Sequence, residues 1–157
     1  MIRRVTTRAV IIKNGMIFCV KQRNSAGQTV DYWCTPGGGL DIREPLVTGL
    51  KREIIEETGV NPEIGNLVLI QQFVDSKGRE QMEFFFHVTN ADDFENIDLN
   101  KTTHGSHEID EFGFVDPATT YILPKILRQI DLSNIDKIER PMIINQIPLN
   151  AEKISTD

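Results

Sequence analysis

Three glutamates stand together in the sequence, with Glu56 and Glu57 following Glu53 by three and four residues. This spacing places the three carboxylates on one face of an α-helix. Like charges at such spacings repel by roughly a few tenths of a kcal/mol per pair, so their concentration calls for a compensating cation. Mg²⁺ prefers oxygen ligands and is usually held by a few carboxylates together with substrate phosphates, and Mn²⁺ accepts the same ligands. The spacing therefore indicates a site for a hard divalent metal ion.

The helix that must carry these glutamates has clear end signals. Pro45 suits the first helical position, and Glu44 beside it complements the positive end of the helix dipole. Gly59 stands where a left-handed C-terminal cap is expected. These signals predict a helix from about residue 45 to residue 58.

An apolar stripe on the same helix predicts how it packs. Val47, Leu50 and Ile54 fall at positions i, i+3 and i+7, which favours packing on a sheet while the glutamates face a cleft. Gly49 in the middle of the helix is about 1 kcal/mol less favourable than alanine. We therefore expect a close contact between helix and sheet at Gly49.

Apolar and β-branched runs before the helix predict β-strands. The runs 8–12 and 16–20 are separated by Asn14-Gly15, a strong signal for a tight hairpin. Residues 31–35 predict a short strand that ends before glycines 37–39. We expect these glycines to form a loop, because glycine permits backbone conformations and close approaches closed to other residues.

Segments after the helix complete a mixed pattern. Residues 66–74, 81–89 and 111–115 predict strands, and residues 124–130 predict a second helix. The tail from about residue 133 contains two prolines but is too apolar for simple disorder, so we expect it to dock on the body or on a second copy in a homodimer. The pattern favours an α+β fold in which the first helix lies among β-strands.

Length and composition limit the classes of protein. A chain of 157 residues fits one compact domain, 1–157, and its formal charge of -6 provides no overall basic field for a nucleic acid polymer. The sequence contains no run of about 18 apolar residues and no targeting pattern, so we expect no membrane partner and a cytoplasmic location. Cys19 and Cys34 are too few for a disulfide framework, which fits a reducing compartment.

Read together, these residues resemble the signature of the Nudix hydrolase family at every defined position. Gly38 is followed by five residues and Glu44, and then by seven residues and Arg52-Glu53-Ile54-Ile55-Glu56-Glu57-Thr58-Gly59-Val60. The resemblance implies a Nudix-type α/β/α sandwich with a mixed sheet between helices. It also implies hydrolysis of a nucleoside diphosphate linked to another group, by attack of water on phosphorus with Mg²⁺ or Mn²⁺ bound.

The resemblance also implies roles for individual residues. The metal ligands that it implies are Glu53, Glu56 and Glu57, with the backbone carbonyl of Gly38 as a further ligand and Glu44 as a peripheral, water-mediated partner. Arg52 belongs to the catalytic group because it would orient the glutamates by ion pairing, without touching substrate. These roles agree with the chemistry, since pyrophosphate hydrolysis needs charge neutralised, water activated and both reactants aligned.

The general base is left open between two glutamates. One is Glu53 on the helix, and the other is Glu108 on a later loop, with Glu111 as the second loop candidate. A carboxylate on that loop could also complete the metal shell, so the roles of base and ligand are not separable from the sequence. His104 and His107 on the same loop lack a third ligand at zinc spacing, and we assign them no metal.

Substrate contacts are expected from glycines and basic residues. Gly37, Gly38 and Gly39 would seat the pyrophosphate. Lys21 and Arg23 follow the second hairpin strand and could reach phosphates, with ordinary surface charge as an equal alternative. Arg8 and Arg79 are weaker candidates of the same kind.

Substrate identity follows only by elimination. The marks of the family's coenzyme A, NADH, diadenosine polyphosphate and ADP-ribose subgroups are absent, which favours a nucleoside triphosphate converted to a monophosphate and pyrophosphate. A nucleotide sugar such as ADP-ribose is the alternative substrate. A non-catalytic module that binds a nucleotide or a protein is the alternative class, favoured by the tail and by two departures from the common pattern, Asp41 and Arg43.

Overall fold

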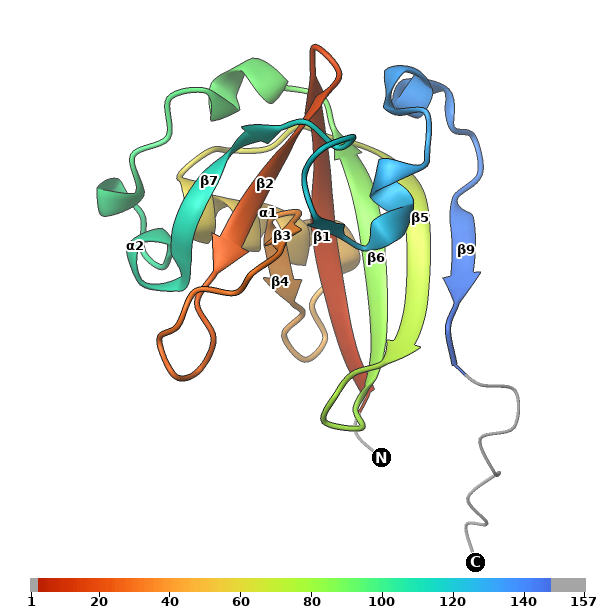
Figure 1. Ribbon diagram of the computed structural model, residues 1–157, viewed down its shortest axis with the longest axis horizontal. Helices are drawn as coiled ribbons and strands as arrows, with labels where there is room; N and C mark the ends of the chain where they lie inside the picture. Colours follow the sequence, from red (N-terminus) through yellow and green to blue (C-terminus); the bar gives the residue numbers. More distant parts are fainter. Residues whose placement is uncertain (1–2, 148–157) are drawn as a thin grey trace, which may run out of the picture.

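A mixed β-sheet dominates the computed structural model, which describes residues 3–147 (Figure 1). The strands in this part of the chain are β1 (Arg3–Lys13), β2 (Met16–Gln22), β3 (Trp33–Cys34), β4 (Gly37–Gly39), β5 (Ile64–Val74), β6 (Glu80–Val88), β7 (Ile109–Val115), β8 (Ile122–Leu123) and β9 (Met142–Asn145). The order through the sheet is β8-β3-β2-β1-β6-β5-β9, while β4 pairs with β1 and β7 pairs with β2.

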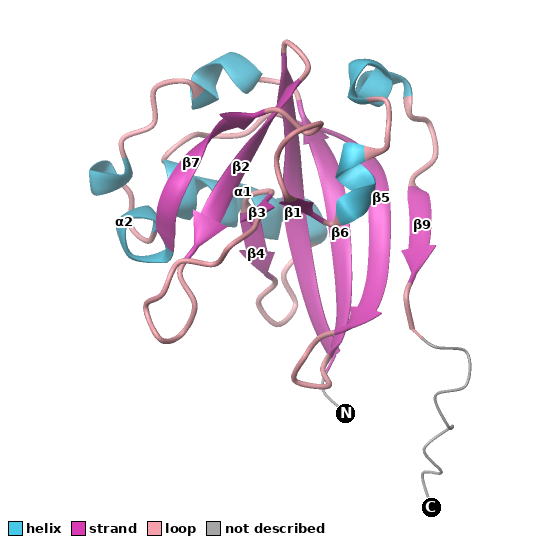
Figure 2. Ribbon diagram, viewed as in Figure 1, coloured by secondary structure: helices cyan, strands magenta, loops and turns pink. Residues whose placement is uncertain are grey.

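Helical segments cover both faces of the sheet (Figure 2). The segments are α1 (Leu46–Thr58), α2 (Gly105–Glu108) and the 3-10 helices η1 (Ala91–Phe94), η2 (Leu99–Lys101), η3 (Lys125–Arg128) and η4 (Leu132–Lys137). One core cluster joins the sheet to α1, and a second joins the opposite face to η3 and η4. The expected α+β fold with a mixed sheet between helices is confirmed, and that residues 1–157 form a single domain stays a prediction.

The predicted hairpin is present, and its first strand organises both cores. Asn14 and Gly15 adopt positive φ angles of 51° and 77°, as a tight turn between β1 and β2 requires. Along β1, Ala9 packs toward α1 and Val10 packs toward η3 and η4, because successive side chains point to opposite faces. The same strand runs parallel to β6, which the local sequence does not reveal.

The long helix ends where its signals place it. Pro45, expected at the first helical position, is instead the N-cap, so the helix begins one residue later, at Leu46. Gly59 caps the other end with a φ of 75°, and its N–H donates to the Ile55 carbonyl at 2.9 Å. The predicted left-handed cap is therefore confirmed.

The apolar stripe of α1 is partly as expected. Leu50 and Ile54 are fully buried, but Val47 is 42% exposed, so its place in the stripe was wrong. The buried face instead includes Leu46, which packs against the core at i-4 from Leu50 and turns Val47 toward solvent.

Gly49 makes a close contact, but not with the sheet. A Cβ atom at this position would lie 2.2 Å from Leu40 Cδ2 and 2.9 Å from Glu44 Oε2. Both residues belong to the segment that precedes α1. The expected contact between helix and sheet was therefore wrong, and Gly49 instead lets this segment fold back against the helix.

Two other expectations are corrected. Residues 37–39 do not form a loop, because their backbone pairs with β1 as the short strand β4. The second helix expected over residues 124–130 is reduced to the 3-10 helix η3, which begins after Pro124. The Leu127 side chain is fully buried there, so tertiary packing and not helix propensity orders this segment.

The tail docks on the body, as one of the two alternatives predicted. Strand β9 pairs in parallel with β5, from Leu69 opposite Met142 to Gln72 opposite Asn145, and lies along the outer edge of the sheet in Figure 1. Residues 148–157, also part of the predicted tail, lie outside the described residues. No helix among residues 3–147 is long and apolar enough to cross a membrane.

Candidate active site

A polar cleft of about 620 Å³ lies beside the second half of α1. Its carboxylates are Glu53, Glu56, Glu57 and Glu108, and its arginines are Arg4, Arg8, Arg23 and Arg52. The three glycines of strand β4 line this cleft, and so do His104 and His107. Such a mixture of acidic and basic groups suits a ligand that carries both phosphates and a metal ion.

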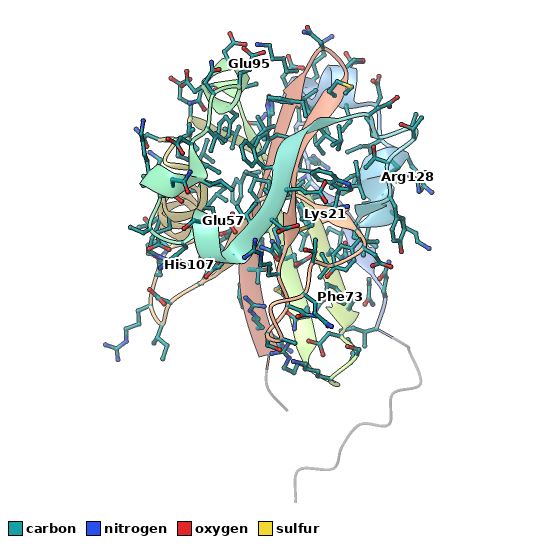
Figure 3. All side chains as sticks on the ribbon, turned by 60° about the vertical axis from the view of Figure 1, so that its left-hand side comes forward. Lys21, Glu57, Phe73, Glu95, His107 and Arg128 are labelled. Carbon is teal, nitrogen blue, oxygen red and sulfur yellow. The ribbon has the colours of Figure 1, made fainter. Side chains whose placement is uncertain are left out.

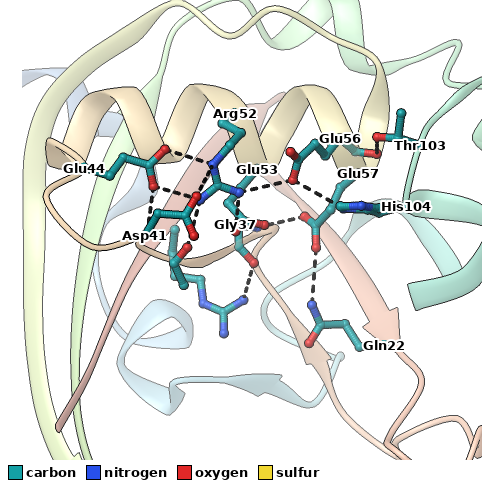
Figure 4. A network of polar contacts seen from close by, with 12 residues as sticks. Gln22, Gly37, Asp41, Glu44, Arg52, Glu53, Glu56, Glu57, Thr103 and His104 are labelled. Atoms are coloured by element: carbon teal, nitrogen blue, oxygen red, sulfur yellow. Dashed lines mark hydrogen bonds and ion pairs between the residues drawn. The ribbon is translucent and has the colours of Figure 1, made fainter.

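Glu57, drawn with its hydrogen-bond partners in Figure 4, is the most deeply buried of these carboxylates. Its exposed fraction is 1%. The Gly37 N–H donates to its Oε2 at 2.9 Å, and Gln22 Nε2 donates to its Oε1 at 3.4 Å. Burial raises the pKa of Glu57 to about 7, although the Gly37 N–H and the charge of Arg8 act in the opposite direction. At neutral pH the carboxylate is therefore poised to ionise when a cation arrives.

Glu53 fills the space that a side chain at Gly38 would need. A Cβ atom on Gly38 would lie 2.4 Å from Glu53 Oε2. Burial raises the pKa of Glu53, while hydrogen bonding to Arg52 opposes the rise. Glycine at position 38 thus lets the Glu53 carboxylate lie directly against the backbone of β4.

Arg52 holds the outer carboxylates of α1 in one network (Figure 4). One terminal nitrogen lies 2.9 Å from Glu53 Oε1 and 3.1 Å from Glu56 Oε2. The other donates to the Gly39 carbonyl at 3.0 Å. These are the ion pairs that an orienting role requires, and the role itself stays a prediction.

Glu44 is engaged on the side of Arg52 away from the cleft. Arg52 Nε and a terminal nitrogen donate to its two oxygens at 2.8 Å each, and the Asp41 N–H donates at 2.9 Å. These hydrogen bonds, those from Arg52 first, lower the pKa of Glu44 to about 2. Glu44 is not among the cleft residues. In this structure Glu44 therefore holds the Arg52 guanidinium in position.

The donor set of the cleft fits a hard divalent ion, although it is not a closed metal site. Among residues 3–147, no three acidic, His or Cys side chains already form a ligand set, and Arg52 occupies oxygens of Glu53 and Glu56. The available donors are oxygens, as Mg²⁺ and Mn²⁺ prefer. Glu57 is a buried carboxylate whose ionised form lacks a full countercharge. For Glu53 Oε1 and Glu56 Oε2 to bind an ion, each would exchange its contact with Arg52.

Of the two loop candidates for the general base, Glu108 lines the cleft and Glu111 does not. Glu108 ends α2 and lines the cleft, where its charge adds to burial in raising the pKa of Glu57. Helix α2 is set closely against α1, since a Cβ atom on Gly105 would lie 2.2 Å from the Glu57 carbonyl. Glu111 lies on β7, pairs with Lys21 at 3.2 Å and does not line the cleft.

Of the four basic residues considered as phosphate contacts, two line the cleft and two do not. Arg23 and Arg8 line the cleft, with Arg23 paired to Asp110 at 2.8 Å. Lys21 does not line it, because its Nζ pairs with Glu111 and lies 5.2 Å from the centroid of the Trp33 ring. Figure 3 shows Lys21 apart from Glu57. Arg79 is also outside the cleft and pairs with Asp75 at 2.8 Å.

Sequence reasoning missed several residues of the cleft, including Asn24, Ser25 and Gly27 of the loop after β2. Arg4 lies two strand repeats before Arg8 on the same face of β1, so the alternation along that strand was a usable signal. Gln22 gave no signal. The two histidines were assigned no metal and no other role, yet His104 Nδ1 lies 3.3 Å from Glu56 Oε2.

The two departures from the family pattern leave the geometry intact. Arg43 adopts a φ of 67°, a left-handed conformation in which glycine is favoured. The segment therefore keeps a conformation suited to glycine while carrying an arginine, which is exposed and does not line the cleft. The Asp41 carboxylate lies 3.8 Å from Arg52 and joins the same network.

Known proteins resemble the chain in sequence and in fold. The family model described as NUDIX domain matches residues 2–134. A Xenopus laevis protein, nucleoside diphosphate-linked moiety X motif 6, is 39% identical over 59 residues, which is 38% of this chain and only 26% of that protein. The MutT protein from Methanosarcina mazei Go1 has a TM-score of 0.66 at 20% identity, covering 87% of this chain and 94% of its own. The E. coli ORF135 protein has a TM-score of 0.64 at 21% identity, covering 85% and 91%.

Proposed function

Because this chain belongs to the Nudix hydrolase family, we propose that it hydrolyses the pyrophosphate linkage of a nucleoside diphosphate-linked substrate with Mg²⁺ or Mn²⁺ bound. The finer proposal is a nucleoside triphosphate, converted to a monophosphate and pyrophosphate, with a nucleotide sugar such as ADP-ribose as the alternative. The observation that carries the proposal is Glu57, a buried carboxylate held by the Gly37 N–H in a cleft that also contains Glu53 and Glu56.

Within this proposal, the acidic residues divide the work. Glu53, Glu56 and Glu57 hold the metal ion together with the Gly38 carbonyl, and Arg52 orients the outer two. A bound ion supplies charge neutralisation on the phosphate oxygens and makes water more acidic. Glu53 is already engaged by Arg52, whereas Glu108 reaches the cleft from another element, so we favour Glu108 as the base that takes the proton of the attacking water.

The phosphates are bound by backbone and arginines. We propose that the pyrophosphate lies over Gly37–Gly39 of β4, with Arg4 and Arg23 at the rim of the cleft. Arg4 suits this role because its guanidinium lies beside Gly39, 3.4 Å from where a Cβ atom would stand. Planar guanidinium groups match phosphate oxygens in a two-pronged way. Lys21 is not included, since its amino group is engaged outside the cleft. A cytoplasmic location and a homodimer stay predictions.

The test is a panel of nucleotides and nucleotide sugars, incubated with Mg²⁺ or Mn²⁺, with products identified by mass. We expect release of a nucleoside monophosphate, and loss of at least a thousandfold in kcat for Glu57→Gln. Glu139→Gln is the matched control, because Glu139 is exposed and outside the cleft. Activity that survives both Glu57→Gln and EDTA would refute the mechanism. Tight binding without turnover across the panel would instead favour the non-catalytic module.

A further inference from the structure

A second cavity, of about 490 Å³, adjoins the cleft. Arg8 and Gln22 line both cavities, so a ligand bound in the cleft can extend past them into the second space. Its volume is in the range that holds a small organic group. We call it the β5–β9 pocket, after the strands that supply Gln71, Phe73 and Ile144 to its walls.

The floor of this pocket has polar groups that the protein itself does not satisfy. Gln71 and Glu83 are direct cross-strand partners on β5 and β6, so their side chains lie next to each other. Gln71 is 6% exposed, and its Oε1 has no hydrogen-bond partner among the described residues. Leaving such a buried group unpaired destabilises a folded protein. A ligand that pairs with the Gln71 amide would remove this penalty.

Glu83 has one oxygen engaged and one available. Its Oε1 accepts the Thr6 hydroxyl at 3.2 Å and two nitrogens of Arg8 at 3.4 Å each. Within residues 3–147, the hydrogen bonds that this carboxylate accepts all end on Oε1. Oε2 is therefore an acceptor aimed at no protein donor, beside the Gln71 amide. Together the two side chains present a carboxylate acceptor next to an amide.

The walls above this floor are aromatic and aliphatic. Phe73 follows Gln71 by two residues on β5 and therefore lies on the same face, and Figure 3 shows it below Lys21 and away from Glu57. Tyr32, Ile126 and Ile144 complete the apolar lining. Flat apolar walls with a polar floor suit a planar heterocycle, whose faces stack and whose edge forms hydrogen bonds.

One wall comes from outside the region shared with the family. The family model ends at residue 134, whereas Ile144 lies on β9 and Gln146 directly follows it. The Gln146 N–H donates to the Gln72 carbonyl at 2.8 Å, which fixes this segment against β5. The pocket is thus completed by a part of the chain that the family match does not cover.

We propose that the β5–β9 pocket binds the nucleobase of the substrate, and that Gln71 and Glu83 determine which base is accepted. Glu83 Oε2 accepts a base N–H, and the Gln71 amide pairs with the neighbouring group on the base edge. Ile144 closes the pocket over the ring. The inference rests on the proposed function, because the base can reach this pocket past Arg8 and Gln22 only if the diphosphate of the same substrate lies in the cleft.

The experiment measures binding and turnover separately. Nucleoside monophosphates with each of the four common bases are titrated into the metal-free protein by calorimetry, and kcat and KM are measured for the four triphosphates. We expect the wild type to prefer one base by about tenfold or more. Gln71→Ala and Glu83→Gln should reduce that preference to within about threefold by raising KM, with kcat nearly unchanged.

Further variants keep the test decisive. Gln72→Ala is the matched control, since Gln72 is the neighbour of Gln71 on β5 and does not line the pocket. Ile144→Ala, at the edge of the sheet, should raise KM for the preferred base about three- to tenfold and serves if a floor variant fails to fold. If Gln71→Ala and Glu83→Gln slow the hydrolysis of all four triphosphates by the same factor, the base-reading role is wrong and the proposed function stands. If the protein binds one base selectively, these variants abolish that selectivity and no triphosphate is hydrolysed, the base-reading role stands and the proposed function is wrong.

Discussion

Replacing Glu57 with glutamine measures how much the ionised, buried carboxylate lowers the free energy of unfolding. The pKa of Glu57 is raised by burial from an ordinary 4.5 to about 7. One pKa unit corresponds to about 1.4 kcal/mol, so ionising this group in the folded protein reduces the free energy of unfolding by on the order of 3 kcal/mol. Glutamine has the same shape without the charge and should not incur this loss.

The sign of the pH dependence follows from the order of deprotonation. Below pH 4.5, Glu57 is protonated in both the folded and the unfolded protein, and its stabilising contribution is complete. As the pH rises, the unfolded chain releases the proton first, and stability is lost until the folded group also ionises near pH 7. Above that pH the loss is complete.

Urea unfolding in EDTA, followed by the fluorescence of Trp33, measures this effect. Between pH 5 and pH 8, the stability of Glu57→Gln relative to wild type should rise by roughly 2–3 kcal/mol. Taking this difference cancels the other titrating groups, and the Glu139→Gln control should show no such rise. Saturating Mg²⁺ at pH 8 should stabilise the wild type and not Glu57→Gln, by about 2.7 kcal/mol at a hundred times Kd. A difference between wild type and Glu57→Gln that stays constant from pH 5 to pH 8 would refute the reasoning.

Four further substitutions test the residues that support the site and the core. Gly38→Ala should reduce kcat at least tenfold, while the free energy of unfolding in urea falls by less than about 1 kcal/mol, because only the end of the Glu53 side chain must move. Gly37→Ala should lower the free energy of unfolding by more than about 2 kcal/mol. Its Cβ would lie 2.2 Å from a backbone oxygen, at a φ of 129°. Equal stability losses in the two variants would contradict this. Arg52→Lys keeps the charge but loses the two-pronged contact with Glu44, so kcat should fall about tenfold while stability changes by about 1 kcal/mol or less, and unchanged kcat would argue against an orienting role. Leu50→Ala should destabilise the fold by about 2–5 kcal/mol in the same unfolding assay, and a loss below about 1 kcal/mol would contradict its fully buried position.

Local signals were sufficient for the elements that position the glutamates. Asn14-Gly15 specifies a turn by its own backbone preferences, and Gly59 specifies a helix end in the same way. The glutamates share a helix face because the helical repeat is fixed by geometry. Predictions of this kind need only residues within one or two turns of one another.

The rest depended on contacts between distant parts of the chain. Val47 and Leu46 fit the helical pattern equally well, and only the direction from which the sheet approaches buries Leu46. The engagement of Glu44 by Arg52 follows from the fold-back of the preceding segment, and the pairing of Lys21 with Glu111 follows from the neighbourhood of β2 and β7. Periodicity along the chain contains no such information.

The position of β9 has a further consequence for the exposed edge of the sheet. Strand β5 would otherwise be the outer strand of the sheet, with a row of backbone N–H and C=O groups open to pairing with another chain. By occupying that row from Leu69 to Gln72, β9 shields it and leaves only a four-residue strand at the boundary. A version of the chain cut at residue 134 would therefore expose a long β-edge, and the segment that completes the β5–β9 pocket also guards the protein against edge-to-edge aggregation.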